Sequence, residues 1–71
     1  AITITGLDER ADVKIVTSNG ALVNTGKAAN GEYKWYGLDR NGKRVASGVY
    51  MVEITTEEGS KGVVCKIAII N

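Results

Sequence analysis

The sequence predicts an all-β fold, an antiparallel β-sandwich of six to seven short strands. Apolar and polar residues alternate with a period of two along several short segments, which is the pattern of half-buried strands. Turn residues interrupt these segments at short intervals, most clearly in three Asn-Gly pairs. The chain has no helical periodicity and no proline. Together these features favour strands joined by tight turns.

Length and composition fit one small domain. A chain of 71 residues, of which 44% are hydrophobic, can build one core but leaves little room for a buried catalytic pocket. Nine basic and eight acidic residues give a net charge of +1, so the chain lacks the excess of positive charge that is typical of proteins that bind nucleic acid or anionic membranes. No apolar run approaches the roughly 20 residues of a membrane span. We therefore expect neither a nucleic-acid-binding nor a membrane-spanning protein.

The first two strands are expected at residues 1–5 and 11–18, separated by a charged loop. Their alternation places the isoleucines of the first strand on one face and Lys14 and Val16 of the second strand on the outer side. The acidic residues of the loop lack the six to eight convergent oxygens of a calcium site. We expect no metal there.

A hairpin is expected at Asn19-Gly20, which leads into a strand at residues 21–23. An Asn-Gly pair between two strand-like segments predicts a type I′ turn, in which both central residues have positive φ. Residues 25–30 are small and polar, and we expect them to form a loop.

Residues 33–50 hold the only tryptophan and all three tyrosines. A strand at residues 32–36 would turn Trp35 inward, as the central ring of a thin core, and Tyr36 outward. An aromatic platform for sugars or bases is the alternative, but it needs several exposed coplanar rings. The core position is favoured.

A tight turn is expected from Asp39 to Gly42. The Asp39 carboxylate can accept hydrogen bonds from backbone N–H groups two or three residues on, and Gly42 supplies a left-handed conformation. The same residues resemble the front of a calcium loop, but the further acidic positions of that loop are missing. Arg40, Lys43 and Arg44 form the only basic cluster, which is either solvated charge around the turn or a partner contact.

The last third of the chain predicts strands at residues 45–46, 49–56 and 61–70. A kink at Gly48 precedes the second of them, in which Tyr50 faces the core. The third strand turns Val63, Cys65, Ile67 and Ile69 inward. Its outer face is unusually apolar, which suggests cover by a neighbouring domain or partner; the residues concerned are Val64, Ala68 and Ile70.

The sequence holds no set of residues suited to catalysis. Histidine, the commonest general base and zinc ligand, is absent. The single Cys65 lies at an inward strand position and is interpreted as a small apolar residue rather than a nucleophile. No Gly-x-Ser-x-Gly elbow or phosphate-binding glycine loop occurs. We expect no enzymatic activity, no cofactor and no metal site.

The run from residue 35 to residue 50 resembles the motif Trp-Asp-Gly-x-Asp-x-x-Gly-x-x-Val-Ala-Ser-Gly-Val-Tyr. That motif belongs to the Ig-like domain of the flagellar hook-capping protein and to the related C-terminal sorting domains of the bacterial type IX secretion system. The resemblance extends to the opening strands and to the closing Lys-Ile-Ala-Ile-Ile-Asn, and it is greatest to PorZ-type surface proteins. The matching structural positions are Trp35, Asp39, Gly42, Gly48 and Tyr50.

The resemblance implies a non-catalytic sorting or surface-attachment domain with an Ig-like sandwich fold, recognised as a folded signal by the secretion machinery. It implies export through the periplasm to the outer membrane and cell surface of Bacteroidetes, a sortase-like partner such as PorU, and a link to anionic lipopolysaccharide. We expect residues 1–71 to be one C-terminal domain of a larger protein, with targeting information upstream. The chain departs from many relatives at Tyr36, where they carry Asp, and at Asn71, where they end in a basic residue.

The expected partner contacts lie on the last strand and the loop before it, at Gly59, Lys61, Lys66, Ile70 and Asn71. An unpaired edge there could also accept a strand from a partner. The alternative function is an accessory Ig-like spacer or interaction module in an extracellular hydrolase or a propeller-bearing two-component sensor. In that case the partners are the upstream domains of the same protein.

Overall fold

The computed structural model describes residues 2–56, 58–59 and 61–70, without the side chains of residues 63 and 64. The strands are β1 (Ile2–Ile4), β2 (Asp12–Thr17), β3 (Leu22–Lys27), β4 (Tyr33–Trp35), β5 (Gly48–Thr55) and β6 (Lys61–Ile69). Four of them form one sheet in the order β3-β2-β5-β6, and β1 pairs with β4 in a second sheet. All neighbouring strands are antiparallel. The predicted all-β, Ig-like antiparallel sandwich is confirmed, with six strands in the described part of the chain.

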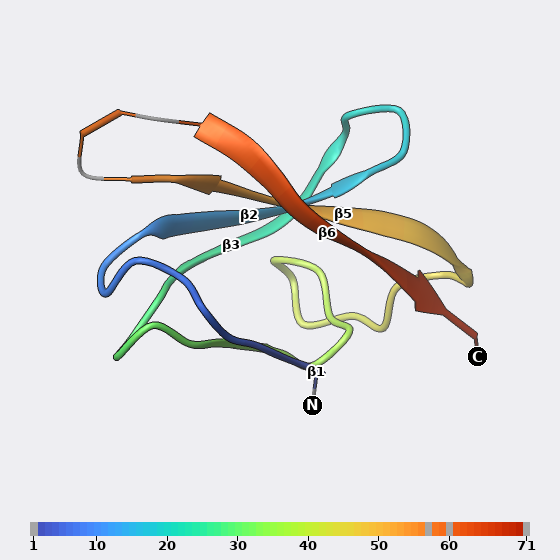
Figure 1. Cartoon of the computed structure of the whole chain (residues 1–71). Coiled ribbons are helices and arrows are strands. Elements are labelled where there is room, and N and C mark those ends of the chain that lie inside the picture. Colours follow the sequence, from blue (N-terminus) through green and yellow to red (C-terminus); the bar gives the residue numbers. More distant parts are fainter. Residues whose placement is uncertain (1, 57, 60, 71) are drawn as a thin grey trace.

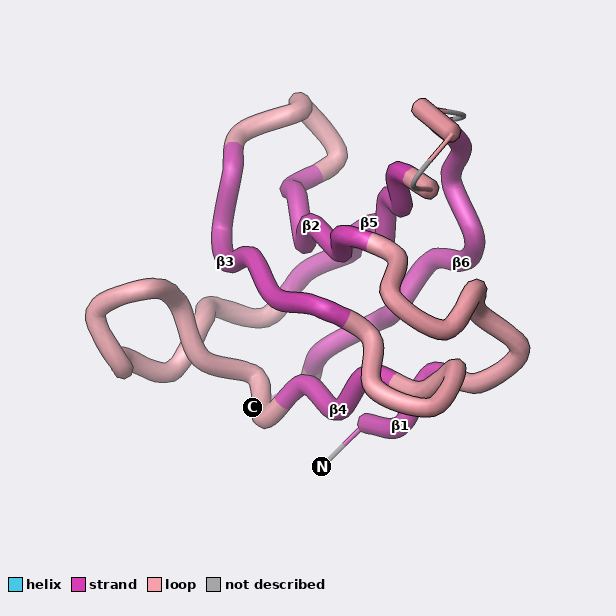
Figure 2. The backbone as a smooth tube through the Cα atoms, turned by 90° about the vertical axis from the view of Figure 1, so that its left-hand side faces the viewer, coloured by secondary structure: helices cyan, strands magenta, loops and turns pink. Residues whose placement is uncertain are grey.

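The two sheets form two layers (Figures 1 and 2). The four-stranded sheet is strongly twisted, and the short β1–β4 sheet lies beneath it together with the loops that follow β4. Strands β3 and β6 are the two edges of the larger sheet. The side of this sheet that faces β1 and β4 is called the inner face below, and the opposite side the outer face.

The core fills the space between the layers around Trp35, whose side chain is 2% exposed. The rings of Trp35 and Tyr50 meet edge to face, with centroids 5.5 Å apart and planes at 63°, a preferred aromatic geometry. The indole Nε1–H donates a hydrogen bond of 2.9 Å to the carbonyl oxygen of Leu38, and the Tyr50 hydroxyl donates to that of Ala46. Both buried rings thus have their polar atoms satisfied, and both lie in the core as the sequence predicts.

The hairpin at Asn19-Gly20 forms, but the predicted type I′ turn is wrong. Only Gly20 has positive φ, at 90°, and the amide of Thr17 donates to the carbonyl of Ala21 across a three-residue loop. The Thr17 hydroxyl accepts a hydrogen bond of 3.0 Å from the Ala21 amide, which stabilises this longer loop. Type I′ geometry occurs instead at Asn30 and Gly31, with φ of 55° and 77°.

The loop predicted from residue 25 to residue 30 begins later, because β3 continues to Lys27. Thr25 pairs with Lys14, and Lys27 pairs with Asp12, to which it also forms an ion pair of 3.3 Å. Gly26 allows this extension, since the ring of Tyr33 occupies the space where a side chain at residue 26 would lie.

The strand predicted at residues 45–46 is absent. Val45 is buried, and its amide donates to the carbonyl of Gly37, while Leu38 and Arg44 form an isolated bridge. Residues 36–47, called the long turn below, thus fold over the core rather than joining a sheet.

Val16 lies on the outer face as predicted, since it pairs with Leu22 and Met51, but it is only 4% exposed. Solvent exposure therefore does not follow from an outward position. The predicted directions of Val63 and Val64 lie outside the described side chains.

Candidate docking surface along the C-terminal strand

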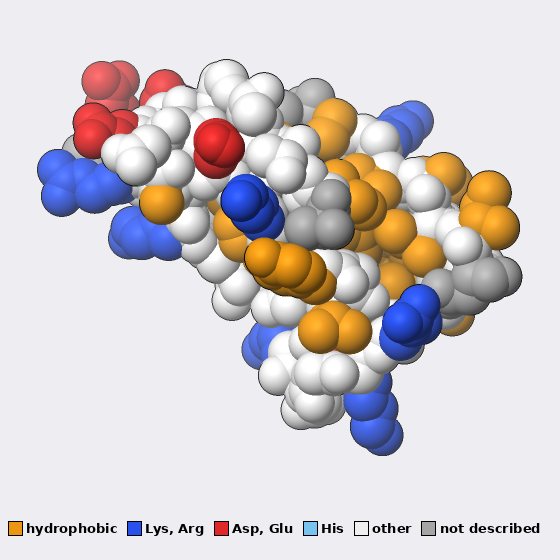
Figure 3. Space-filling view, turned by 90° about the horizontal axis from the view of Figure 1, so that it is seen from below, with side chains coloured by type: hydrophobic (Ala, Val, Ile, Leu, Met, Phe, Trp, Pro, Cys, Tyr) orange, Lys and Arg blue, Asp and Glu red, His pale blue; other side chains and the backbone are white. Residues whose placement is uncertain are grey.

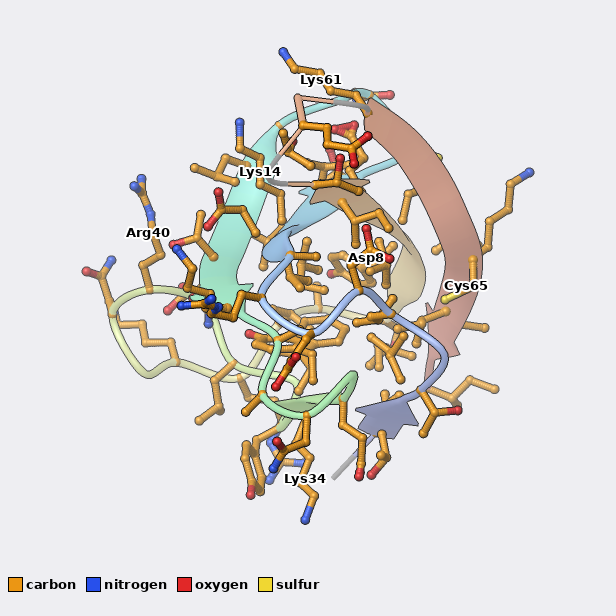
Figure 4. All side chains as sticks on the ribbon, turned by 60° about the vertical axis from the view of Figure 1, so that its left-hand side comes forward. Asp8, Lys14, Lys34, Arg40, Lys61 and Cys65 are labelled. Atoms are coloured by element: carbon orange, nitrogen blue, oxygen red, sulfur yellow. The ribbon has the colours of Figure 1, made fainter. Side chains whose placement is uncertain are left out.

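Strand β6 is an edge of the four-stranded sheet and has β5 as its one sheet neighbour among the described residues. Its ladder with β5 runs from the pair Thr55–Lys61 to the pair Gly48–Ile69. The register shifts between Val52 and Glu53, so that β6 carries one extra residue at that point. In Figure 4 β6 borders one side of the molecule, with Cys65 on it, and β3 borders the other.

The expected contact residues lie along this strand and its flanks. Lys61 and Lys66 are exposed and pair with outer-face residues of β5. Ile70, which follows the end of β6, is 90% exposed. Gly59 is exposed in the preceding turn, where its φ is 87°. Asn71 lies outside the described residues.

These positions do not converge on one pocket. At about 3.3 Å per residue, the distance along the strand from Lys61 to Ile70 is about 30 Å. An arrangement of this kind suits an extended partner or a second protein surface rather than a small substrate.

The inner side of β6 contributes to the core. Cys65, Ile67 and Ile69 are half-buried and pack against the buried cluster, as their alternation predicts. Cys65 is a free thiol in this packed position. Ile2 of β1 packs against the same cluster and is also half-buried.

The outer face carries an apolar area that the sequence showed only in part. It is formed by Val16, Leu22, Val49, Met51 and Ala68, as the register of the strands defines. Leu22 and Val49 are 41% and 48% exposed. The alternation along β5 places Val49 and Met51 on the outer face, but the neighbours contributed by β2 and β3 follow only from strand pairing.

Among the motif residues, Asp39 and Gly42 form a tight turn. Asp39 Oδ1 accepts hydrogen bonds from the amides of Asn41 and Lys43, at 2.9 and 3.0 Å, which lie two and four residues on. Gly42 has the left-handed φ of 79°. Gly48 is the first residue of β5.

The remaining candidates are the basic cluster and Tyr36; Arg40 and Arg44 also line a pocket beside the turn, together with Asp39 and Leu22. Arg40, Lys43 and Arg44 are exposed around the turn, and the Arg40 amide donates to Val23 of β3. Tyr36 is 68% exposed, but the other aromatic rings are buried or half-buried, so no aromatic platform forms.

Burial raises the pKa of the Tyr33 hydroxyl above its usual value of 10.0. Within the described residues, no group of three or more His, Cys, Asp or Glu could hold a metal ion. No helix long and apolar enough to cross a membrane is found in the same residues.

No protein-family model matches the chain, and no curated protein matches it. Among solved structures, it is similar to PorZ, described as an essential bacterial surface component of the type-IX secretion system of human oral-microbiomic Porphyromonas gingivalis. The similarity has a TM-score of 0.80 and 33% sequence identity, and it covers 97% of this chain but 9% of that chain. The chain thus spans less than a tenth of the length of that protein. The similarity supports a PorZ-like relationship for this domain.

Proposed function

We propose that the chain is a non-catalytic domain of a type IX secretion system component or substrate, acting as a sorting or surface-attachment domain. The observation that supports this most is the likeness to PorZ over 97% of the chain at 33% identity. Further support comes from the motif of residues 35–50, whose conspicuous residues are engaged in core packing and a turn. A motif occupied in this way leaves recognition to other surfaces.

The proposed recognition surface is β6 with its flanking residues. Lys61, Lys66 and Ile70 are exposed along it and none of them is needed to fill the core. The proposed partners are surface proteins of the secretion machinery, including a sortase, and the proposed location is the cell surface. A link to anionic lipopolysaccharide rests on the family resemblance alone. The domain would then be the C-terminal part of a larger exported protein.

The test is surface display of the full-length protein that contains this domain. The triple variant Lys61→Glu/Lys66→Glu/Ile70→Asp changes the proposed surface without removing a core side chain. We expect the fraction of protein accessible to antibody on intact cells to fall several-fold. Truncation of residues 66–71 would be less clean, because it removes Ile67 and Ile69 from the core.

The matched control reverses two other exposed lysines, Lys34→Glu and Lys43→Glu, which lie on β4 and in the long turn. Display of this control should equal that of wild type. Thermal unfolding of each variant as the isolated domain verifies the fold. Unchanged display of the folded triple variant would contradict the proposal.

The alternative is an accessory module that packs against a catalytic or sensor domain of the same protein. The apolar area of the outer face favours it, since Leu22 and Val49 expose a large part of their side chains to solvent. Substituting both by Thr would then lower the stability or activity of the neighbouring domain and leave export unchanged. Under the sorting proposal, the triple variant at β6 changes export instead.

A further inference from the structure

The two edge strands of the four-stranded sheet, β3 and β6, differ in how far other parts of the chain block access to their backbone hydrogen-bonding groups. On β3, the carbonyl of Val23 accepts a hydrogen bond of 3.1 Å from the Arg40 amide, and the Asn24 side chain donates to the carbonyl of Leu38 at 2.9 Å. Further along β3, the Tyr33 ring lies against Gly26. The long turn and β4 therefore obstruct an incoming strand at this edge.

In the part of the chain that the structure describes, the β6 edge has no comparable cover. Among the described residues, none of the backbone hydrogen bonds outside the strand ladders involves residues 61–69. The strand is nine residues long and contains no proline, and beyond the extra residue at its register shift its outward amides and carbonyls form a row from Cys65 to Ile69. Such a row is a template for an added strand.

The side chains beside this row are also incompletely covered. Ile67 and Ile69 on the inner side of β6 are half-buried, and so is Ile2 of β1. In Figure 4, β1 and the end of β6 lie on the same side of the molecule, and both are edge strands. Figure 3 shows apolar side chains gathered over the half of the molecule in which β6 ends. A strand added to β6 would cover the half-buried Ile67 and Ile69, which are called the apolar seam below.

The charges of β6 define the chemistry of the added strand. The strand carries Lys61 and Lys66 and no acidic residue. Both lysines lie on the outer face, whereas Cys65, Ile67 and Ile69 lie on the inner face. Since directly opposed residues of paired strands share a face, a complementary strand has apolar residues on its inner side and carboxylates on its outer side.

We propose that the β6 edge is a strand-addition site for an extended segment of a partner protein in which apolar residues alternate with acidic ones. The identity of the partner as a secretion protein rests on the proposed function, whereas the mode of binding rests on the open edge, the apolar seam and the two lysines. A second copy of this chain is a poorer occupant, because its β6 brings two further lysines and no carboxylate.

The test uses a fluorescein-labelled peptide of nine residues in which valine and glutamate alternate, titrated with the 71-residue chain and followed by fluorescence anisotropy. We expect saturable binding and slower hydrogen exchange of the β6 amides. The double variant Lys61→Glu/Lys66→Glu should lower affinity at least about tenfold, which corresponds to about 1.4 kcal/mol. The same double variant should bind a second peptide, in which lysine replaces glutamate, more tightly than the wild-type chain binds that peptide. Unfolding of the variant cannot produce this reversal of preference.

Two matched peptides separate strand addition from plain charge attraction. A peptide of the same composition with its valines and glutamates in separate blocks should bind at least tenfold more weakly, because it cannot present one apolar and one acidic face. A peptide methylated at alternate backbone nitrogens keeps its side chains but loses its pairing donors, and it should also fail to bind.

Several results would overturn the proposal. These are the absence of saturable binding, binding of either matched peptide as tight as that of the alternating peptide, and protection of β3 instead of β6. Concentration-dependent dimers protected at β6 in sedimentation and exchange experiments would identify a second copy as the occupant and refute the heterologous partner. The peptide assay involves no secretion, so a negative result there refutes strand addition and leaves the sorting function to be decided by the export experiment. Likewise, a negative export experiment refutes the sorting function and leaves strand addition to be decided by the peptide assay.

Discussion

Substitution of Gly26 by alanine tests the packing that allows β3 to continue past residue 25. A Cβ atom built at residue 26 would lie 2.2 Å from Cε1 of Tyr33 and 2.9 Å from Cζ. Ordinary van der Waals contact begins at about 3.4 Å, so the ring must move by more than 1 Å. Tyr33 packs against the core, which limits that movement.

The expected cost combines two opposing effects. Overpacking of a well-packed site costs about 1–3 kcal/mol. Replacing glycine by alanine where the backbone permits it stabilises by about 0.4–1 kcal/mol, through the unfolded chain. We therefore expect Gly26→Ala to lower the free energy of unfolding by about 1–2 kcal/mol and Tm by about 4–16 °C, at about 4–8 °C per kcal/mol for a domain of this size.

The assay is urea and thermal unfolding followed by the fluorescence of the buried Trp35. Gly62→Ala on β6 is the matched control, since nothing lies within 4 Å of its built Cβ and its φ is not positive. That control should be neutral or stabilising by up to about 1 kcal/mol. In a Tyr33→Ala background, Gly26→Ala should cost nothing further, because the ring with which it collides has gone. Equal losses from Gly26→Ala with and without the Tyr33 ring would refute the reasoning.

Two further predictions concern the turn and the titration of a buried ring. Asp39→Ala removes two hydrogen bonds to backbone amides and should lower the free energy of unfolding, measured in urea titrations, by about 1–2 kcal/mol. Asp39→Asn keeps an acceptor oxygen and should lower it by less than half as much. Equal losses for the two variants would contradict the role given to the carboxylate oxygen. Because burial raises the Tyr33 pKa, the unfolded state ionises first, so the resulting stabilisation is complete below pH 10 and declines as pH rises from there through the folded pKa. Unfolding measured at pH 8 and pH 11 should show a smaller loss of stability for Tyr33→Phe than for wild type; equal losses for the two proteins would contradict this assignment.

The sequence was most informative where one local pattern decides the outcome. Period-two alternation located the ends of β2, β5 and β6 to within about two residues, because apolar and polar side chains must alternate along any strand that has one buried and one exposed face. Trp35 and Tyr50 were assigned to the core correctly, since large aromatic side chains at inward positions of a small domain have nowhere else to pack.

Turn geometry was predictable only in part. The sequence holds Asn-Gly at residues 19–20 and at residues 30–31, and the type I′ conformation occurs at the second pair alone. The Asn-Gly pair is the same in both places, so the difference arises from the residues and contacts around it. The Thr17 side chain stabilises a three-residue loop at the first pair, and a reciprocal pair of backbone hydrogen bonds between Ala29 and Glu32 closes the second.

The surface was harder to anticipate than the strands. The pattern identified Ala68 and Ile70 as outward apolar residues, but not that Val16 lies between Leu22 and Met51 on the same face. Pairing brings together residues from strands far apart in the sequence, and no local pattern contains that information. The extent of the apolar outer area therefore required the register.

By itself, the sequence predicted a small sandwich of half-buried strands around Trp35, with exposed Lys61 and Lys66 on its last strand and Ile70 at the end of that strand, although the strand ends one residue earlier, at Ile69. Only the tertiary structure decided that β6 is an open edge while the long turn closes the β3 edge. The physical reason is that alternation fixes which way a side chain points, whereas the availability of backbone hydrogen-bonding groups depends on which strands become neighbours.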